Sequence, residues 1–321
     1  KRYRVMNTKK GTYLVTGGAG FIGSHVVDHL IGLGHRVIVV DNLSTGKKEH
    51  INPKALFHYG DIRDRKNIAE WFEGVDGVFH LAALARIQPS FEKPEKYVEV
   101  NVLGTKNILE LAKEYKIKRV VYSASSSAYG HQIKLLRENM ALSPQALSPY
   151  SSTKRIGEML MRDMGSMTGG PETVCLRYFN VYGPRQTTTV DGPYATVVGI
   201  FLDQWKRKEP FSLVPFPGKS LGAQRRSFTH VNDVAEANLR AMDSPRAGSG
   251  EIINIGTKNS TSIKELAFLI GGKNYPLVKA PDRKNEVFET RADIRKAKKL
   301  LGWMPCVALK QGIEQLKKAS A

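Results

Sequence analysis

The chain has 321 residues, of which 41% are hydrophobic and only two are cysteines. At about 150 residues per domain, this length predicts two domains, or one large α/β unit with an appendage. Cys175 and Cys306 form no CxxC pair, which excludes a disulfide-rich fold and a multi-cysteine metal site. There is no run of about 18 apolar residues, and Lys1 to Arg4 precede no apolar segment, so we expect a cytoplasmic protein with no membrane anchor, secretory signal or bound metal.

The charge balance is strongly basic, with 49 Lys and Arg against 30 Asp and Glu and a formal net charge of +19. Such a surplus favours anionic partners, which are nucleic acids, membrane surfaces or phosphorylated small molecules. The positive residues are spread along the chain, with small clusters at Lys9-Lys10, Lys47-Lys48, Arg225-Arg226 and 295–299. No zinc-finger or RNP-type aromatic pattern accompanies them, so a basic surface around an anionic-ligand site is favoured over nucleic-acid binding.

The first half of the chain alternates short apolar, β-rich runs with helical patterns. Helices are expected at 21–33, 94–115 and 150–164, and the strands at 12–16, 36–40, 56–59, 77–80, 119–123 and 173–176. Strands separated by helices imply parallel βαβ crossovers. The prediction is therefore an α/β fold with a Rossmann-type, doubly wound parallel sheet.

After about residue 180 the sequence pattern changes, and loops rich in Gly and Pro become frequent. Short helices are expected there at 196–206, 231–242, 262–270 and 293–300. We expect a first domain over 1–180 and a smaller C-terminal α/β lobe over 181–321, with 228–255 packing back onto the first domain. Because ligands of open α/β sheets bind at the carboxyl ends of the strands, the cleft between the two parts is the expected site.

A glycine-rich turn follows the first expected strand and opens the first expected helix. It reads Thr16-Gly17-Gly18-Ala19-Gly20-Phe21-Ile22-Gly23. Glycines permit a tight turn and the close approach of a pyrophosphate, and the helix N-terminus faces the phosphates. The next strand leads to Asp41, whose carboxylate can bind ribose hydroxyls and would repel a 2′-phosphate. The turn therefore predicts binding of NAD rather than NADP.

Asn42, directly after Asp41, and two further strand ends are expected to contact the cofactor. One of these ends carries Asp61 and Ile62. The other carries the small-residue segment Leu81, Ala82 and Ala83, which lets a flat ring pass close to the backbone.

Tyr150 and Lys154 are four residues apart at the start of an expected helix, which places them on one face. A phenol with a pKa near ~10 is a poor base at neutral pH, and a nearby ammonium would lower that pKa. Ser125 to Ser127 supply a hydroxyl at the end of another strand. A trio of this kind is typical of proton transfer beside a nicotinamide.

Taken together, the sequence resembles the extended short-chain dehydrogenase/reductase family and, within it, the UDP-glucose 4-epimerase group, over nearly the whole chain. Nine segments in family order carry the resemblance: TGGAGFIGSH (16–25), DNLSTG (41–46), GDIRD (60–64), HLAA (80–83), SASSSAYG (123–130), PYSSTK (149–154), RYFNVYGPRQ (177–186), RRSFTHVNDVAEA (225–237) and ADIRKAKKLLGW (292–303). The resemblance implies an NAD-binding first domain, a nucleotide-sugar-binding lobe, and catalysis by Ser125, Tyr150 and Lys154, with Ser126 as the nearest alternative hydroxyl.

The same resemblance separates reaction types. Dehydratases of the family carry an Asp-Glu pair just after the catalytic hydroxyl, and decarboxylases typically keep a Glu there. This chain has Ser126 and Ser127 at those positions, which cannot act as acids. The implied reaction is 4-epimerisation of a UDP-sugar through a transient 4-keto sugar, with a tightly held NAD.

The resemblance also implies a substrate site. It assigns phosphate binding to Asn180, Arg226 and Arg283, ribose binding to Glu286, and contact with uracil to the backbone of Thr196 and Val197, with Ser125 and Ser126 near the sugar. Ser227 replaces the usual Asp, so Arg226 is expected to be less firmly braced, and Arg225 could share or replace its role. Arg86 and Gln88 also depart from the family pattern in a loop near the sugar.

Thr290 is the position that the resemblance ties most closely to specificity. A bulky tyrosine there closes the pocket beside C2, whereas a small residue leaves room for an N-acetyl group. UDP-GlcNAc and UDP-GalNAc are therefore expected substrates, alongside or instead of UDP-glucose and UDP-galactose.

Alternative functions remain open at this point. One is a UDP-glucuronate 4-epimerase in which Arg86 or Arg185 meets the carboxylate, and another is a non-catalytic, nucleic-acid-binding relative. The family is usually homodimeric. A contribution of 150–164 to a dimer is as compatible with the spacing of Ile156, Met159, Leu160 and Met164 as packing onto the sheet.

Overall fold

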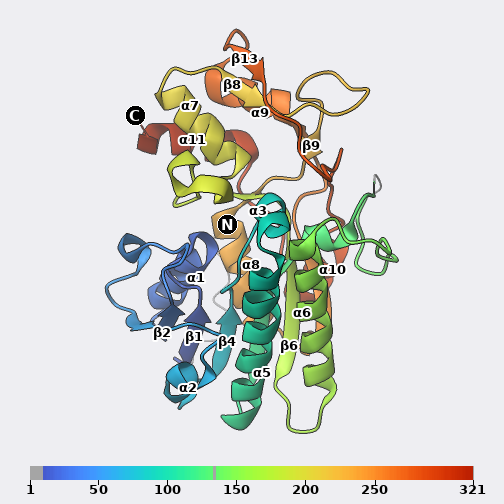
Figure 1. Cartoon of the computed structure of the whole chain (residues 1–321). Coiled ribbons are helices and arrows are strands. Elements are labelled where there is room, and N and C mark those ends of the chain that lie inside the picture. Colours follow the sequence, from blue (N-terminus) through green and yellow to red (C-terminus); the bar gives the residue numbers. More distant parts are fainter. Residues whose placement is uncertain (1–9, 133–134, 321) are drawn as a thin grey trace.

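The computed structural model describes residues 10–132 and 135–320, so the expectations for Lys1 to Arg4 and for Lys9 lie outside it. Its centre is a parallel sheet of seven strands in the order β11-β6-β5-β4-β1-β2-β3 (Figure 1). The strands are β1 Thr12–Thr16, β2 Arg36–Asp41, β3 Leu56–Tyr59, β4 Gly77–His80, β5 Arg119–Ser125, β6 Glu172–Tyr178 and β11 Ser249–Ile255. The prediction of a doubly wound parallel sheet is confirmed.

Helices cover both faces of this sheet. They are α1 Phe21–Gly32, α2 Arg65–Ile68, α3 Ile87–Glu92, α4 Pro94–Val98, α5 Gly104–Glu114, α6 Pro149–Ser166, α8 Val231–Asp243 and α10 Arg295–Leu301. α1 and α8 pack against one another on one face, and α5 and α6 lie side by side on the other (Figure 1).

Each face of the sheet has its own core because side chains of a strand alternate between faces. Val15, Val37 and Val39 belong to the core beneath α1 and α8, whereas Leu14 and Ile38 belong to the core beneath α5. The continuous apolar runs in the sequence are thus strands buried on both sides.

The C-terminal lobe has a separate core above the sheet (Figure 1). It consists of α7 Val197–Lys206, α9 Ile263–Gly271, α11 Leu309–Ser320 and the paired short strands β8 Phe211–Leu213 and β13 Leu277–Lys279. Two two-residue pairings link it to the loops at the strand ends, β7 Val181–Tyr182 with β10 Thr229–His230 and β9 Arg225–Arg226 with β12 Thr261–Ser262. The segment 228–255 contains α8 and β11, and β11 is the outer strand beside β6. The division into domains at residue 180 stays a prediction.

The expected helix over 94–115 is interrupted. A π-helical turn at Glu99–Leu103 separates α4 from α5 and buries Asn101. The Asn101 side chain exchanges hydrogen bonds with both backbone groups of Leu84 (2.8 and 3.0 Å) and donates to Thr153 Oγ1 (3.1 Å). Since an i→i+5 turn inserts one residue into the helix, it places this amide where a regular helix would not.

The apolar residues of α6 divide between two faces of the helix. Met159 and Ile156 are 62% and 38% exposed, whereas Leu160 and Met164 pack against the sheet core. No helix in residues 10–132 and 135–320 is long and apolar enough to cross a membrane.

Candidate active site

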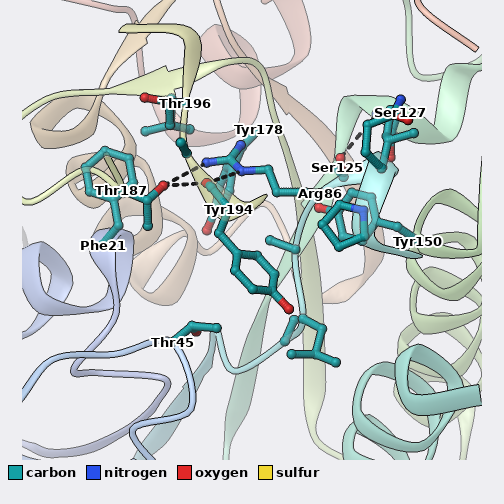
Figure 2. Close-up of a pocket in the computed structure, with 18 of the residues that line it drawn as sticks. Phe21, Thr45, Arg86, Ser125, Ser127, Tyr150, Tyr178, Thr187, Tyr194 and Thr196 are labelled. Atoms are coloured by element: carbon teal, nitrogen blue, oxygen red, sulfur yellow. Dashed lines mark hydrogen bonds between the residues drawn. The ribbon is translucent and has the colours of Figure 1, made fainter. Parts of the chain in front are cut away.

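A cavity of about 760 Å³ lies where the strand ends meet the C-terminal lobe. All the residues that the sequence singled out for cofactor, catalysis and substrate line it, together with Arg86 and the loop before α7 (Figure 2). They are Gly17, Gly20, Phe21, Ile22, Gly23, Asp41, Asn42, Asp61, Ile62, Leu81, Ala82, Ala83, Ser125, Ser126, Tyr150, Lys154, Asn180, Thr196, Val197, Arg226, Arg283, Glu286 and Thr290.

The glycine turn is built so tightly that side chains do not fit. Gly17 has φ +72°, and a Cβ there would lie 2.6 Å from the backbone nitrogen of Ala82. A Cβ on Gly23 would lie 2.1 Å from the carbonyl oxygen of Gly17. Gly20 immediately precedes α1, so the free N–H groups of the first helical turn face the cavity. This cradle fits a pyrophosphate.

Asp41 at the end of β2 is held by the backbone. Its carboxylate accepts hydrogen bonds from Ala19 N (3.0 Å) and Leu43 N (2.8 Å), and burial raises its pKa above the usual range. Asn42 donates to Asp61 (2.9 Å), whose pKa is lowered to about 2, mainly by hydrogen bonds from Arg63. An acidic pair of strand ends therefore stands beside the glycine cradle, which fits an adenosine ribose without a 2′-phosphate.

Tyr150 and Lys154 lie one turn apart near the start of α6, and both line the cavity. Tyr150 lies beside Ser125 (Figure 2). The Ser148 side chain caps the helix by accepting from Ser151 N (3.2 Å), which fixes its first turn. Lys154 Nζ donates to the carbonyl oxygen of Ser123 (2.6 Å) and lies 4.8 Å from the centre of the Tyr122 ring. The Ser125 hydroxyl accepts from Ser127 N (3.2 Å).

The electrostatics of this trio differ from the sequence expectation. Burial lowers the pKa of Lys154 to about 7, so the amine is partly neutral near neutral pH. Burial also raises the pKa of Tyr150, against the opposing effects of a hydrogen bond with Ser125 and the positive charge of Arg86. In the protein alone, the cation that favours the phenolate is Arg86 rather than Lys154.

Asn101 was missed by the sequence reasoning. Its contacts with Leu84 and Thr153 tie the cavity loop after β4 to the catalytic helix α6. A lone Asn within an apparently continuous helical pattern carried no signal that could have revealed the π-helical turn.

The expected specificity position Thr290 lies against Asn180. Asn180 Nδ2 donates to Thr290 Oγ1 (3.1 Å) and to the carbonyl oxygen of Ser227 (3.2 Å). Ser227 itself pairs with Thr257 Oγ1 (3.0 Å). The amide of Asn180 is therefore held in place by Thr290 and by Ser227, the residue that follows Arg226.

Arg226 is braced in spite of the missing Asp at position 227. It forms an ion pair with Glu286 and donates to the carbonyl oxygens of Arg225 (2.9 Å) and Phe288 (3.2 Å). Arg225 points away from the cavity lining and contacts Ser260, Glu265 and Glu289. The guanidinium of Arg225 is committed to these contacts outside the cavity, which speaks against its sharing or replacing the role of Arg226.

At the far end of the cavity, Thr196 caps α7. Its hydroxyl accepts from Gly199 N (2.8 Å) and donates to Gln186 (3.0 Å), while its backbone N donates to Thr187 O (3.2 Å). Arg283 lies on the exposed loop before Glu286 and lines the same end.

Arg86 crosses the cavity from the loop after β4 toward the loop before α7 (Figure 2). Its Nε donates to the carbonyl oxygen of Tyr194 (2.8 Å), and one terminal nitrogen lies 3.5 Å from Thr187 Oγ1. Arg185 instead pairs with Asp28 (2.7 Å) and does not line the cavity.

Comparison with known proteins places the chain among nucleotide-sugar enzymes. The profile of the NAD dependent epimerase/dehydratase family matches residues 13–256. A Methanocaldococcus jannaschii protein, provisionally named UDP-glucose 4-epimerase, is 42% identical over 311 residues, covering 94% of this chain and 96% of that protein. The structure of UDP-glucose 4-epimerase from Thermotoga maritima with UDP-glucose is 38% identical, with a TM-score of 0.87, covering 97% of this chain and 100% of that one.

Other similar proteins are named for an acidic sugar or have one bound. The structure of MoeE5 in complex with UDP-glucuronic acid and NAD is 30% identical, has a TM-score of 0.84 and covers 96% of this chain and 100% of that one. UDP-N-acetyl-alpha-D-glucosaminuronate decarboxylase of Bacillus cytotoxicus is 34% identical over 318 residues, covering 94% of this chain and 95% of that protein.

Proposed function

Since the chain belongs to the NAD-dependent epimerase/dehydratase family of UDP-sugar enzymes, we propose that it catalyses 4-epimerisation of a UDP-hexose. The observation that carries this proposal is the surroundings of Ser125. Tyr150 and Lys154 face the same cavity, while Ser126 and Ser127 follow Ser125 where a dehydratase or decarboxylase needs a carboxylate.

NAD is the cofactor, and when bound it supplies the hydride acceptor and donor for C4 of the sugar. The glycine cradle from Gly17 to Gly23 would hold its pyrophosphate and Asp41 its adenosine ribose. Asn42, Asp61, Ile62 and Leu81 to Ala83 would line the remainder of the cofactor site.

The protein's own chemistry is proton transfer at the 4-hydroxyl. Tyr150 would take that proton during oxidation and return it during reduction, because its phenol lies beside Ser125 in the cavity. Ser125 would share a hydrogen bond with the hydroxyl and fix its position. Lys154, anchored on the carbonyl oxygen of Ser123, would orient the cofactor ribose and provide positive charge when protonated.

The opposite half of the cavity would bind the UDP group. Arg226 and Arg283 would meet the diphosphate together with Asn180, and Glu286 the uridine ribose. The backbone of Thr196 and Val197 would meet uracil. The support is that these residues line one continuous cavity with Tyr150.

We further propose that N-acetylated hexoses are accepted, because the short Thr290 side chain beside Asn180 leaves space next to the sugar. Thr290→Tyr should abolish turnover of UDP-GlcNAc and UDP-GalNAc while sparing UDP-glucose and UDP-galactose. Equal losses on both pairs would contradict this role.

The function is tested by incubating the purified protein with UDP-GlcNAc, UDP-glucose or UDP-glucuronate in separate tubes, without added NAD, and resolving the epimers. A product identifies the reaction and a retained cofactor, and the fastest tube identifies the substrate. No epimer in any tube, even with NAD supplied, would contradict the proposal and return attention to anion binding by the basic surface. RNA affinity with steep salt dependence, unchanged by Tyr150→Phe, would then support the nucleic-acid alternative.

A homodimer is proposed through the outer face of α4 to α6, where Val98, Leu103 and Met159 are exposed. Light scattering should give twice the chain mass for the wild-type protein and the monomer mass for Met159→Glu. A wild-type monomer would contradict it.

A further inference from the structure

Arg86 is a cavity cation to which the proposed reaction assigns no anion. The pyrophosphate of the cofactor has the glycine cradle, and the diphosphate of the substrate has Arg226 and Arg283. Arg86 lies between these regions, beside the catalytic Tyr150 (Figure 2). Among the residues that the structure describes, no carboxylate lies within ion-pair distance of it.

The position of this side chain is fixed from both ends. The backbone of Arg86 has φ +81°, a conformation that is uncommon for residues with a Cβ and persists where surrounding contacts impose it. At the other end, Tyr194 O accepts both from Arg86 Nε (2.8 Å) and from Thr187 Oγ1 (2.6 Å). The guanidinium therefore stands in a defined place across the sugar end of the cavity.

Its contacts also leave part of the guanidinium unused. A guanidinium has five N–H donors, and the contacts with Tyr194 and Thr187 occupy the edge formed by Nε and one terminal nitrogen. The edge formed by the two terminal nitrogens has no acceptor among the described residues. That edge matches a carboxylate, which it can bind through two parallel hydrogen bonds.

We propose that Arg86 selects substrates whose hexose carries a carboxylate, so that the enzyme acts on UDP-hexuronic acids in preference to neutral UDP-hexoses. A half-buried cation without a counter-ion is costly, and burial lowers the pKa of Arg86 accordingly. A carboxylate on the sugar would offset this cost, whereas a neutral hydroxymethyl group would not. This inference rests on the proposed 4-epimerase function and names the substrate class for that site.

The alternative cation from the sequence, Arg185, is not available for this role. Its guanidinium pairs with Asp28 at 2.7 Å and lies outside the cavity lining. Arg185→Gln is therefore a matched control, because it removes the same charge and side-chain length at a site away from the sugar.

The test compares UDP-glucuronate with UDP-glucose, which differ only in the oxidation state of C6. Arg86→Gln should lower kcat/KM for UDP-glucuronate about 10- to 100-fold more than for UDP-glucose, the effect of losing a hydrogen-bonded charge. The loss of its positive charge beside Tyr150 lowers turnover of both substrates equally, so the ratio of the two values is the readout. Arg86→Lys should give an intermediate loss, because it keeps the charge and loses the second hydrogen bond. Arg185→Gln should leave the ratio of the two substrates unchanged.

Equal losses of kcat/KM on both substrates would overturn the proposal. They would mean that Arg86 acts on Tyr150 or holds the loop at Tyr194 in place. A wild-type preference for UDP-glucose would overturn it as well. Calorimetric binding of the same two nucleotides to the NAD-loaded Tyr150→Phe protein, with and without Arg86→Gln, separates this question from catalysis. If no sugar is epimerised but UDP-glucuronate still binds more tightly through Arg86, the reaction assignment fails and the charge selection stands. If Arg86→Gln leaves both affinities unchanged, the charge selection fails.

Discussion

Two glycines of the same helix should respond in opposite ways to replacement by alanine. A Cβ on Gly23, in the first turn of α1, would lie 2.1 Å from the carbonyl oxygen of Gly17 and 3.0 Å from the Cα of Gly18. These are backbone atoms, so no side chain can rotate away. On Gly32, the last residue of α1, an added Cβ would have no neighbour within 4 Å.

The magnitudes follow from these distances. Overpacking at Gly23 costs about 1–3 kcal/mol, and alanine in a helix returns about 0.5–1 kcal/mol, so Gly23→Ala should lose up to about 2.5 kcal/mol. Gly32→Ala should gain about 0.4–1 kcal/mol. For a protein of this size one kcal/mol corresponds to roughly 2 °C in Tm. Gly23→Ala should also reduce NAD content, because the displaced Gly17 carbonyl accepts the hydrogen bond of Gly20 N that shapes the cradle.

The assays are thermal unfolding by circular dichroism and chromatographic measurement of NAD released from the denatured protein. Gly32→Ala controls for the alanine itself, since it makes the same change at an open site. If Gly23→Ala retained wild-type Tm and full NAD content, the tight turn would not be a requirement of the site, and the reasoning from glycine geometry would be refuted.

Three further results are expected. Tyr150→Phe should lower kcat by about 10²–10⁴-fold with little change in substrate Kd, because it removes only the transferable proton; a wild-type kcat would reject Tyr150 as the acid–base group. Burial lowers the pKa of Lys154 to about 7, so between pH 7 and 10.5 the unfolded chain binds more protons than the folded protein. The free energy of unfolding of the wild type should therefore rise with pH in this range. Its slope should exceed that of Lys154→Met by up to about 1.4 kcal/mol per pH unit. Parallel pH profiles in denaturant titrations would contradict that shift. Arg177→Met should lower the free energy of unfolding by about 3–5 kcal/mol in denaturant titrations, because it leaves the Glu158 carboxylate buried without its partner. The two side chains of this ion pair are only 2% and 4% exposed. Arg177→Met/Glu158→Leu should recover most of the lost stability, and no recovery would mean that the loss comes from packing.

The sheet and its site were predictable where local pattern and function coincide. The glycine turn predicted the start of α1, apolar runs predicted β1 to β6, and strand ends predicted Asp41 and Ser125 at one edge. Each of these depends on short-range geometry, which a periodic sequence expresses directly.

Other features depend on long-range packing and could not be predicted in the same way. The π-helical turn at Asn101 exists because its amide meets Leu84 and Thr153, which are distant in sequence. The lowered pKa of Lys154 follows from its burial by the surrounding elements. Arg86 stood out as unusual in sequence, but its direction across the cavity depends on Tyr194, more than 100 residues later.

The place of β11 in the sheet has a consequence for how the chain is made. This strand, residues 249–255, pairs with Thr173 to Tyr178 of β6, so this edge of β6 remains unpaired and hydrophobic until synthesis has passed residue 255. Edges of this kind recruit other chains. A fragment ending at residue 180 would keep the glycine turn and the catalytic helix while exposing that edge, and it would be a poor stand-alone nucleotide-binding module. Synthesis must therefore pass well into the C-terminal half before the first half can complete its sheet.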